Sequence, residues 1–277
     1  MKKQLFTAAL ALFVCAAAHA APCNVAADGD VNVALRRAAY EGDTQNAHCL
    51  LGAGADVNSA NKRGITALLL AAFTIVYGSS AALKETHFKR RLAYSTVANL
   101  SYILFGAALM TPAGLIGALL HMAAHACIKI LSFFAAGAVL HQTGRTSIYE
   151  LDGLGMRMPV TFACFTCSAL ALTGIPPFSG FVSKWYLLRA AAESGGVAFI
   201  GAGALLLSAL LTAIYMLSVV RRAWFPDRNA DFDGLLSVKE ADGRMLVPMV
   251  LTALGTLVFG VFSEPILRAA QAIAAGL

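Results

Sequence analysis

The chain has 277 residues, of which 58% are hydrophobic and only 13% are charged, and its mean hydropathy is +0.70. This composition excludes an ordinary soluble domain and indicates a protein of the lipid bilayer. The formal net charge of +6 does not indicate nucleic-acid binding, because the basic residues stand at the ends of apolar segments rather than on one solvated face.

Residues 1–20 have the features of a secretory signal peptide. Two lysines precede a short apolar run that ends in Ala18-His19-Ala20, a small-residue pattern typical of cleavage sites. An N-terminal membrane anchor is the alternative, but the apolar run is short for one. We therefore expect the residues that follow to be exported.

Residues 21–72 are more polar, and part of them resembles the ankyrin repeat. The stretch CLLGAGADVNSANKRGITALLLAA, residues 49–72, matches the end of one repeat, a turn and the start of the next. Only about one and a half repeats are visible, whereas stacked repeats need about three to bury a core. A periplasmic ankyrin interaction module on a membrane anchor is therefore the weaker functional hypothesis. Cys23 and Cys49, in an oxidising compartment, are either a disulfide or two unpaired thiols.

Long apolar runs dominate the rest of the chain. Five of them could each cross a hydrocarbon core of ~30 Å, which takes about 20 residues: 92–110, 114–140, 158–192, 196–220 and 245–264. The uncharged residues 65–83 are either a further span or an ankyrin helix, and we favour the span. The sequence thus predicts an all-α, polytopic transmembrane helix bundle preceded by a short helical ankyrin-like segment. The expected domains are 1–20, 21–72 and 73–277.

The third apolar run is interrupted by Pro176 and Pro177, with Gly180 soon after. Tandem prolines remove backbone donors and stop a helix, and in lipid such a break survives only where protein or water satisfies the freed groups. The basic connections 84–91, 141–157 and 221–244 fall on one side of the membrane only if residues 158–192 cross once. The positive-inside rule therefore favours one discontinuous helix, with these loops cytoplasmic.

Titratable groups occur within the apolar runs. His121, His125 and Lys129 are spaced i, i+4 and i+8, so they share one helix face. A cation in hydrocarbon costs at least ~2.5–3.5 kcal/mol, so these groups face protein or water, either as a proton relay or as polar contacts between helices. Lys184, soon after the break, either lies at depth or extends to the lipid headgroups, and the break favours depth.

Four stretches carry a resemblance to a known family. They are FKRRLAYSTVANLSYILFG (88–106), HMAAHACIKILSFFAAGAVLHQ (121–142), LDGLGMRMPVTF (151–162) and LALTGIPPFSGFVSKWYLL (170–188). Residues 73–265 resemble the C-terminal half of the antiporter-like proton-translocating subunits of respiratory NADH–quinone oxidoreductase, multisubunit Na⁺/H⁺ antiporters and membrane-bound hydrogenases. The resemblance implies a proton pathway through Lys89, His121, His125, Lys129 and Lys184, with Lys184 as a terminal exchange residue that is Lys or Glu in different branches.

The resemblance also implies the setting in which the chain works. We expect a multi-pass protein of the bacterial inner membrane, with other membrane subunits of a respiratory or antiporter complex as partners and with redox energy supplied by them. No cofactor or metal is expected in this chain, since it has no glycine-rich nucleotide loop and no cysteine framework for an iron–sulfur cluster. Cys164 and Cys167 are interpreted as packing residues of an apolar helix. Because nothing before residue 73 resembles the family's N-terminal half, a natural fusion and a non-functional fusion both stay open.

Overall fold

The computed structural model describes residues 31, 34–35, 50, 67–226 and 235–275. The predicted signal peptide, nearly all of the ankyrin-like segment, and both Cys23 and Cys49 lie outside these described residues. The chain divides into two compact units, Met1–Thr66 and Ala67–Leu277. The second unit contains every helix whose bounds are given below.

The second unit is a bundle of helices. In chain order they are α4 (Ala67–Lys84), α5 (Phe88–Ala108), α6 (Pro112–Thr143), the 3₁₀ turn η1 (Ile148–Glu150), α7 (Leu154–Arg157), α8 (Pro159–Thr173), α9 (Ser179–Ser194), α10 (Ala198–Trp224), α12 (Gly243–Val261) and α13 (Glu264–Ala275). Four of these, α4, α6, α10 and α12, are long and apolar enough to cross a membrane. The predicted helical membrane bundle is therefore confirmed in its class.

Helix α4 runs without interruption through residues 72 and 73, where the sequence analysis placed the junction between two domains. The residues that the ankyrin pattern assigns to a water-exposed helix are thus the first part of an 18-residue apolar helix. One face of α4, including Leu68, Ile75 and Ala82, is buried, and the helix packs against α5 and α10. This agrees with the membrane span expected over residues 65–83.

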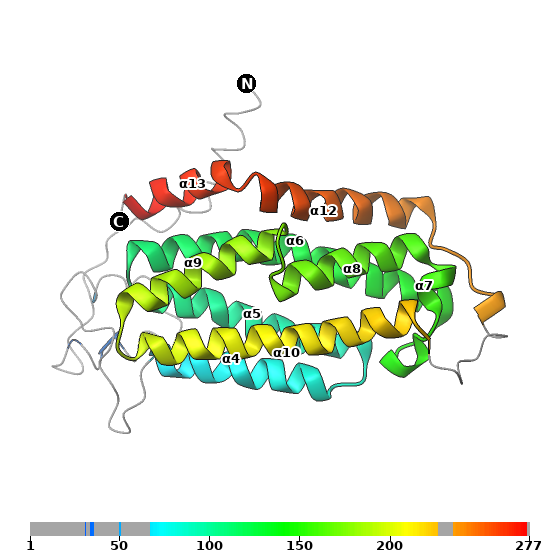
Figure 1. Cartoon of the computed structure of the whole chain (residues 1–277), viewed down its shortest axis with the longest axis horizontal. Helices are drawn as coiled ribbons and strands as arrows, with labels where there is room; N and C mark the ends of the chain where they lie inside the picture. The colour runs from blue at the N-terminus through cyan, green and yellow to red at the C-terminus, as the bar shows by residue number, and fades with distance from the viewer. Residues whose placement is uncertain (1–30, 32–33, 36–49, 51–66, 227–234, 276–277) are drawn as a thin grey trace. The chain divides into compact units, whose positions relative to one another are not determined.

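Helix α6 is the centre of the second unit. It is 32 residues long and contacts α5, α8, α9, α12 and α13. Local sequence sets its ends: the Thr111 side chain accepts a hydrogen bond from the Gly114 N–H, Pro112 occupies the first turn, and Gly144 ends the helix in the left-handed conformation with φ +68°. Figure 1 shows that α8 and α9 follow one another in the same direction alongside α6.

Three connections meet at one end of this unit, on the right in Figure 1. The α4–α5 and α6–α7 connections are joined by backbone hydrogen bonds from Phe88 to Thr146 (2.8 Å) and from Ile148 to Thr86 (2.9 Å). The end of α10 joins them through the bond from the Gly153 N–H to the Arg222 carbonyl (3.1 Å). These are the three basic connections of the sequence, so we refer to this part as the basic end.

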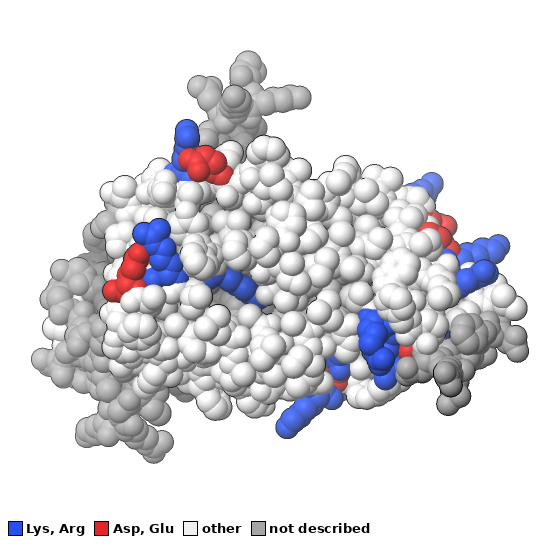
Figure 2. Space-filling view, in the orientation of Figure 1, with Lys and Arg blue, Asp and Glu red and all other residues white. Residues whose placement is uncertain are grey.

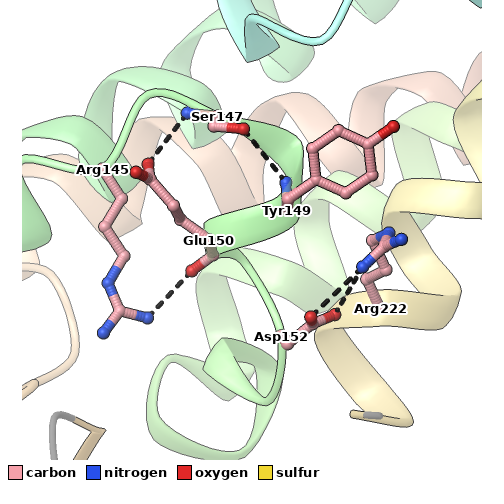
Figure 3. A network of polar contacts seen from close by, with 6 residues as sticks. All are labelled: Arg145, Ser147, Tyr149, Glu150, Asp152 and Arg222. Carbon is pink, nitrogen blue, oxygen red and sulfur yellow. Dashed lines mark hydrogen bonds and ion pairs between the residues drawn. The ribbon is translucent and has the colours of Figure 1, made fainter. Parts of the chain in front are cut away.

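Polar contacts hold the basic end together, as Figure 3 shows. The Glu150 carboxylate accepts the Ser147 N–H at 3.0 Å, which completes a capping box on η1. The Arg222 guanidinium donates to Asp152 at 3.2 Å and lies 4.7 Å from the centre of the Tyr149 ring. Arginine stacked on an aromatic ring and paired with a carboxylate is held in one orientation. The connection between α6 and α8 is thereby fixed to the end of α10.

Two carboxylates at this end lie against helix N-termini, where the helix dipole favours negative charge. Glu85 accepts the backbone N–H of His87, the N-cap residue of α5, at 2.9 Å, and this bond holds the pKa of the Glu85 carboxyl below its usual value. Glu240 comes from the connection between α10 and α12. It accepts the Val160 N–H (2.7 Å) and the Thr161 hydroxyl (2.6 Å) in the first turn of α8. A residue far along the chain thus caps α8.

Figure 2 shows that most charged side chains on the visible face lie toward the two ends and that the surface between them is largely uncharged, apart from a basic side chain visible in a hollow near the middle. In Figure 1 helix α10 lies at the front of this largely uncharged surface. Its apolar side chains Leu206, Leu207, Leu210 and Ile214 are 46–59% exposed. Exposed apolar residues in an uncharged belt are the surface that a membrane protein presents to lipid.

Candidate functional site

The central part of α6 carries the row of basic side chains, and all three are buried. His121, His125 and Lys129 are 3%, 6% and 7% exposed, and the two imidazole rings are stacked with centroids 6.0 Å apart. His121 Nδ1 is 2.9 Å from the Ser183 hydroxyl of α9. Lys129 Nζ donates to the Leu92 carbonyl of α5 at 2.9 Å and to the Ser95 hydroxyl. The row therefore faces protein on both sides, as the cost of charge in lipid requires.

The Lys184 side chain caps the C-terminal end of α8. The last four carbonyls of any α-helix lack partners inside the helix, and here each one is satisfied. The Gly174 N–H donates to Ala171, and the Ile175 N–H donates to Leu170. The remaining carbonyls, of Leu172 and Thr173, both accept from Lys184 Nζ, at 2.6 and 3.1 Å. An ammonium group at a helix C-terminus also interacts favourably with the helix dipole.

The five residues between α8 and α9 contain the tandem prolines Pro176 and Pro177. Gly174 ends α8 at φ +92°, a conformation that L side chains rarely adopt. Gly180, in the first turn of α9, lies so near the end of α8 that an added Cβ would be 1.8 Å from the Ala171 carbonyl oxygen. Only glycine allows this approach of the two helix ends, and the approach brings Lys184 within reach of α8.

Tyr102 of α5 connects Lys184 with the row on α6. Its ring centre lies 5.4 Å from Lys184 Nζ and 5.1 Å from the His121 ring. A cation at this distance from a tyrosine ring is attracted by the ring's negative face. The Tyr102 hydroxyl, in turn, donates to the Ser208 hydroxyl of α10 at 2.8 Å. His121 and Lys184 thus both lie against one aromatic side chain.

Lys89 lies apart from the other four predicted residues. It is half-buried at the start of α5, one turn before Leu92, whose carbonyl accepts from Lys129. It lines a small pocket at the basic end together with His87, Phe88, Ala136, Leu140, Arg145 and Thr146. The structure therefore brings four of the five predicted residues together, three of them buried and Lys184 half-buried, and places Lys89 between this cluster and the basic end.

The cluster contains cations and hydroxyls but no carboxylate, since none of the Asp and Glu side chains in residues 67–226 and 235–275 is buried. Charging every basic group of the row at once would be opposed by their mutual repulsion in a medium of low dielectric constant. Several buried polar atoms have no hydrogen-bond partner within the described residues: Asn99 Oδ1, His121 Nε2, His125 Nδ1 and Ser179 Oγ. Buried polar atoms of this kind are usually satisfied by water. The arrangement suits groups that exchange protons with buried water.

Sequence reasoning did not find Ser95, Tyr102 or Ser183, which contact the predicted residues directly. Ser95 and Tyr102 are seven residues apart, two helical turns, and therefore share the face of α5 that meets α6. Hydroxyl residues are common in apolar helices, so the spacing of Ser95 and Tyr102 indicates a functional face only after the basic row on α6 is known to pack against it.

Residues 55–212 match the family model described as NADH:quinone oxidoreductase/Mrp antiporter, TM, which is more than half of the chain. The chain belongs to this family. The match to the NADH:quinone oxidoreductase/Mrp antiporter family begins at residue 55, whereas the resemblance described from the sequence begins at residue 73. The family match therefore overlaps the ankyrin-like stretch.

Relatives in the family are considerably longer than the part that this chain matches. The chain is 36% identical over 207 residues to NADH-quinone oxidoreductase subunit N of Desulforudis audaxviator, which covers 72% of this chain and 41% of that relative. Among solved structures, the Mrp complex from Dietzia sp. matches with a TM-score of 0.69 and 25% identity, covering 76% of this chain and 46% of the other. Respiratory complex I from Thermus thermophilus gives 0.67 and 27%, covering 75% and 42%. The chain thus spans less than half the length of these relatives.

Proposed function

We propose that this chain is a membrane subunit, or the C-terminal half of one, in a proton-translocating NADH–quinone oxidoreductase or a related cation/proton antiporter complex. The observation that carries the proposal is the cluster in which the half-buried Lys184 caps the short helix α8 beside the buried histidine row. Membership of the family and the names of the matched relatives support it. Other membrane subunits of such a complex are the proposed partners. They would supply the redox energy or the ion gradient that drives proton transfer.

The mechanism uses the different chemistry of the basic groups. A neutral imidazole carries one N–H and one lone pair, so His121 and His125 can accept a proton on one nitrogen and release one from the other. Lys129 and Lys184 can hold a proton as ammonium and release it, and each ammonium is stabilised by backbone carbonyls. Protons would pass between Lys184 and Lys129 through the histidines and buried water, and Lys89 would connect Lys129 to the basic end.

The orientation in the membrane follows from the basic end. We propose that α8 and α9 form one discontinuous crossing broken at Pro176 and Pro177, so that connections 84–91, 141–157 and 221–244 face the cytoplasm of a bacterium. Residues 21–64, after cleavage of the signal peptide 1–20, and the chain beyond Ser263 would face the periplasm. The collinear course of α8 and α9 along α6 supports a single crossing. Residues 21–64 would then serve as an exported N-terminal segment that leads into α4.

Substitution of Lys184 tests the proposed function in the assembled complex. Lys184→Ala removes the titratable group and should abolish proton uptake by proteoliposomes while the complex still assembles. Lys184→Glu should keep part of the flux, because a carboxyl at the same depth can also exchange a proton. Lys184→Arg should conduct worse than Lys184→Glu, since a guanidinium does not deprotonate in proteins. Arg189→Gln, on the exposed side of α9, is the control. Equal flux in all three Lys184 variants and the parent would show that Lys184 is only an anchor.

A further inference from the structure

The small pocket at the basic end lies between the end of α6 and the start of α5. Ala136 and Leu140 line it from the last two turns of α6, a helix that is long and apolar enough to cross a membrane and that ends at Thr143. The end of a membrane-spanning helix lies where the hydrocarbon core meets the lipid headgroups. The pocket therefore lies at the membrane surface, within reach of lipid headgroups.

The ionisable side chains of this pocket are all basic. His87, Lys89 and Arg145 line it, and no Asp or Glu is among the described residues that do. Lys89 forms no hydrogen bond or ion pair with any residue that the structure describes. Arg145 donates a single guanidinium N–H, to the Glu150 carbonyl at 2.8 Å, as Figure 3 shows, and its guanidinium has several further donors. Both cations thus have donors available for an anion.

The carboxylates next in sequence to these cations are held by other groups. Glu85 accepts the backbone N–H of His87 at 2.9 Å, and its side chain lies 3.9 Å from that of the exposed Arg90. Glu150 accepts the backbone N–H of Ser147 at 3.0 Å. The two pocket cations are themselves half-buried, and a partly desolvated cation is stabilised by a negatively charged partner. The pocket is therefore suited to an anion supplied by another molecule.

The remaining wall of the pocket is largely apolar. Phe88 and Ala136 are buried, whereas Leu140 is half-buried and presents part of its side chain. An inorganic anion gains nothing from such a wall, because apolar surface is stabilised by burial against other apolar groups. A molecule that has both a negative charge and a hydrocarbon chain is stabilised by the cations and by the apolar wall together. Basic pockets between transmembrane helices are a recurrent binding site for anionic phospholipid headgroups.

We propose that this pocket binds the phosphate of an anionic phospholipid. The phosphate oxygens accept hydrogen bonds from Lys89 and Arg145, while the adjoining hydrocarbon lies along Leu140. Because the pocket is small, only the phosphate enters it, and the rest of the lipid stays in the bilayer. This binding needs only that the end of α6 lies at the membrane surface, so it is independent of proton transfer.

The test is the affinity of the full chain, purified in a non-ionic detergent, for phosphatidylglycerol that carries a fluorescent label on one acyl chain. We expect saturable binding, about tenfold or more tighter than that of phosphatidylcholine with the same label, whose headgroup has no net charge. Arg145→Gln should weaken binding about tenfold, because a charge-assisted hydrogen bond to the phosphate is lost. Arg145→Lys, which keeps the charge, should weaken it by no more than about threefold.

Arg90→Gln is the matched control, because it removes the same charge from the same end of the chain at an exposed side chain that does not line the pocket. At ~0.15 M salt, which screens exposed charges, it should change the affinity by less than about twofold. Leu140→Ser leaves every charge in place and should weaken lipid binding about fivefold through loss of the apolar wall. If Arg145→Gln does not fold, Leu140→Ser decides the question alone.

Equal losses of affinity in Arg145→Gln and Arg90→Gln would overturn the proposal, because the lipid would then be attracted by the charge of the whole basic end rather than bound in this pocket. Unchanged affinity in a folded Leu140→Ser variant would exclude the apolar wall from the site and would also overturn it. Displacement of the labelled lipid by an equimolar amount of inorganic phosphate would assign the pocket to free phosphate ions instead.

Discussion

Arg91 gives the sharpest test of how the basic end is held together. This arginine is 4% exposed and donates from α5 to acceptors on two other parts of the chain. It reaches the Glu85 carbonyl (2.8 Å) and the Leu83 carbonyl (3.3 Å) at the end of α4, and also the Tyr215 carbonyl and the Ser218 hydroxyl of α10, both at 3.0 Å. The planar guanidinium thus joins three helices in one place.

The perturbation is Arg91→Lys, which keeps the charge and removes the fork of donors. A single ammonium nitrogen cannot reach acceptors on both sides of a guanidinium, so we expect at least two of the four hydrogen bonds to be lost. Bonds from a charged donor contribute about 1.5–3 kcal/mol each in soluble proteins, whereas inter-helix bonds in membrane proteins average ~0.6 kcal/mol. For two bonds these values give a loss between about 1.2 and 6 kcal/mol, and because Arg91 is charged and buried we expect about 3 kcal/mol.

The neighbouring Arg90 provides the matched control. Its side chain is 69% exposed and lies 3.9 Å from the Glu85 carboxylate, so Arg90→Lys should change stability by about 0.5 kcal/mol or less. Unfolding of the purified protein in detergent can be followed by the fluorescence of Trp224, at the end of α10. If Arg91→Lys unfolds at the same denaturant concentration as Arg90→Lys, the buried guanidinium does not hold the three helices together.

Two further predictions concern the break and the topology. An added Cβ at Gly260 of α12 would lie 1.9 Å from the Pro177 carbonyl oxygen, so Gly260→Ala should displace α12 from the break and lower both stability and proton flux. Gly255→Ala, in open space on the same helix, should change neither. Equal stability of the two variants would contradict this contact. Cysteines introduced at Arg145 and Arg228 should both be labelled from the cytoplasmic side, and labelling from opposite sides would exclude a single broken crossing.

Much of the bundle could be predicted from the sequence, because apolar length and proline position act locally. The run 114–140 corresponds closely to α6, and Pro176 lies in the five residues between the end of α8 and the start of α9. The helical spacing of His121, His125 and Lys129 was sufficient to predict a shared face. What the sequence could not show was which helix faces that row. The contacts of Lys129 with Ser95 and of Lys184 with Leu172 depend on how three helices pack, and no periodicity within one helix encodes them.

The apolar run 245–264, expected to be one span, corresponds to α12, which is long and apolar enough to cross a membrane, and a separate helix, α13, begins at Glu264. The predictions on the signal peptide and on the Cys23–Cys49 pair concern residues that the structure does not describe. They stay predictions, because no contact of the described residues bears on them.

The short length of α8 has a consequence for how the protein is made. Its 15 residues rise only about 22 Å at 1.5 Å per residue, which is less than the ~30 Å of the hydrocarbon core. Helix α9 is of similar length and carries Lys184 within it. If segments are inserted into the membrane one at a time during synthesis, neither α8 nor α9 is long enough to span the hydrocarbon core by itself. The two helices together need a packing partner inside the membrane. Helices α4, α5 and α6 are synthesised first, so α6 is already present when α8 and α9 pack against it.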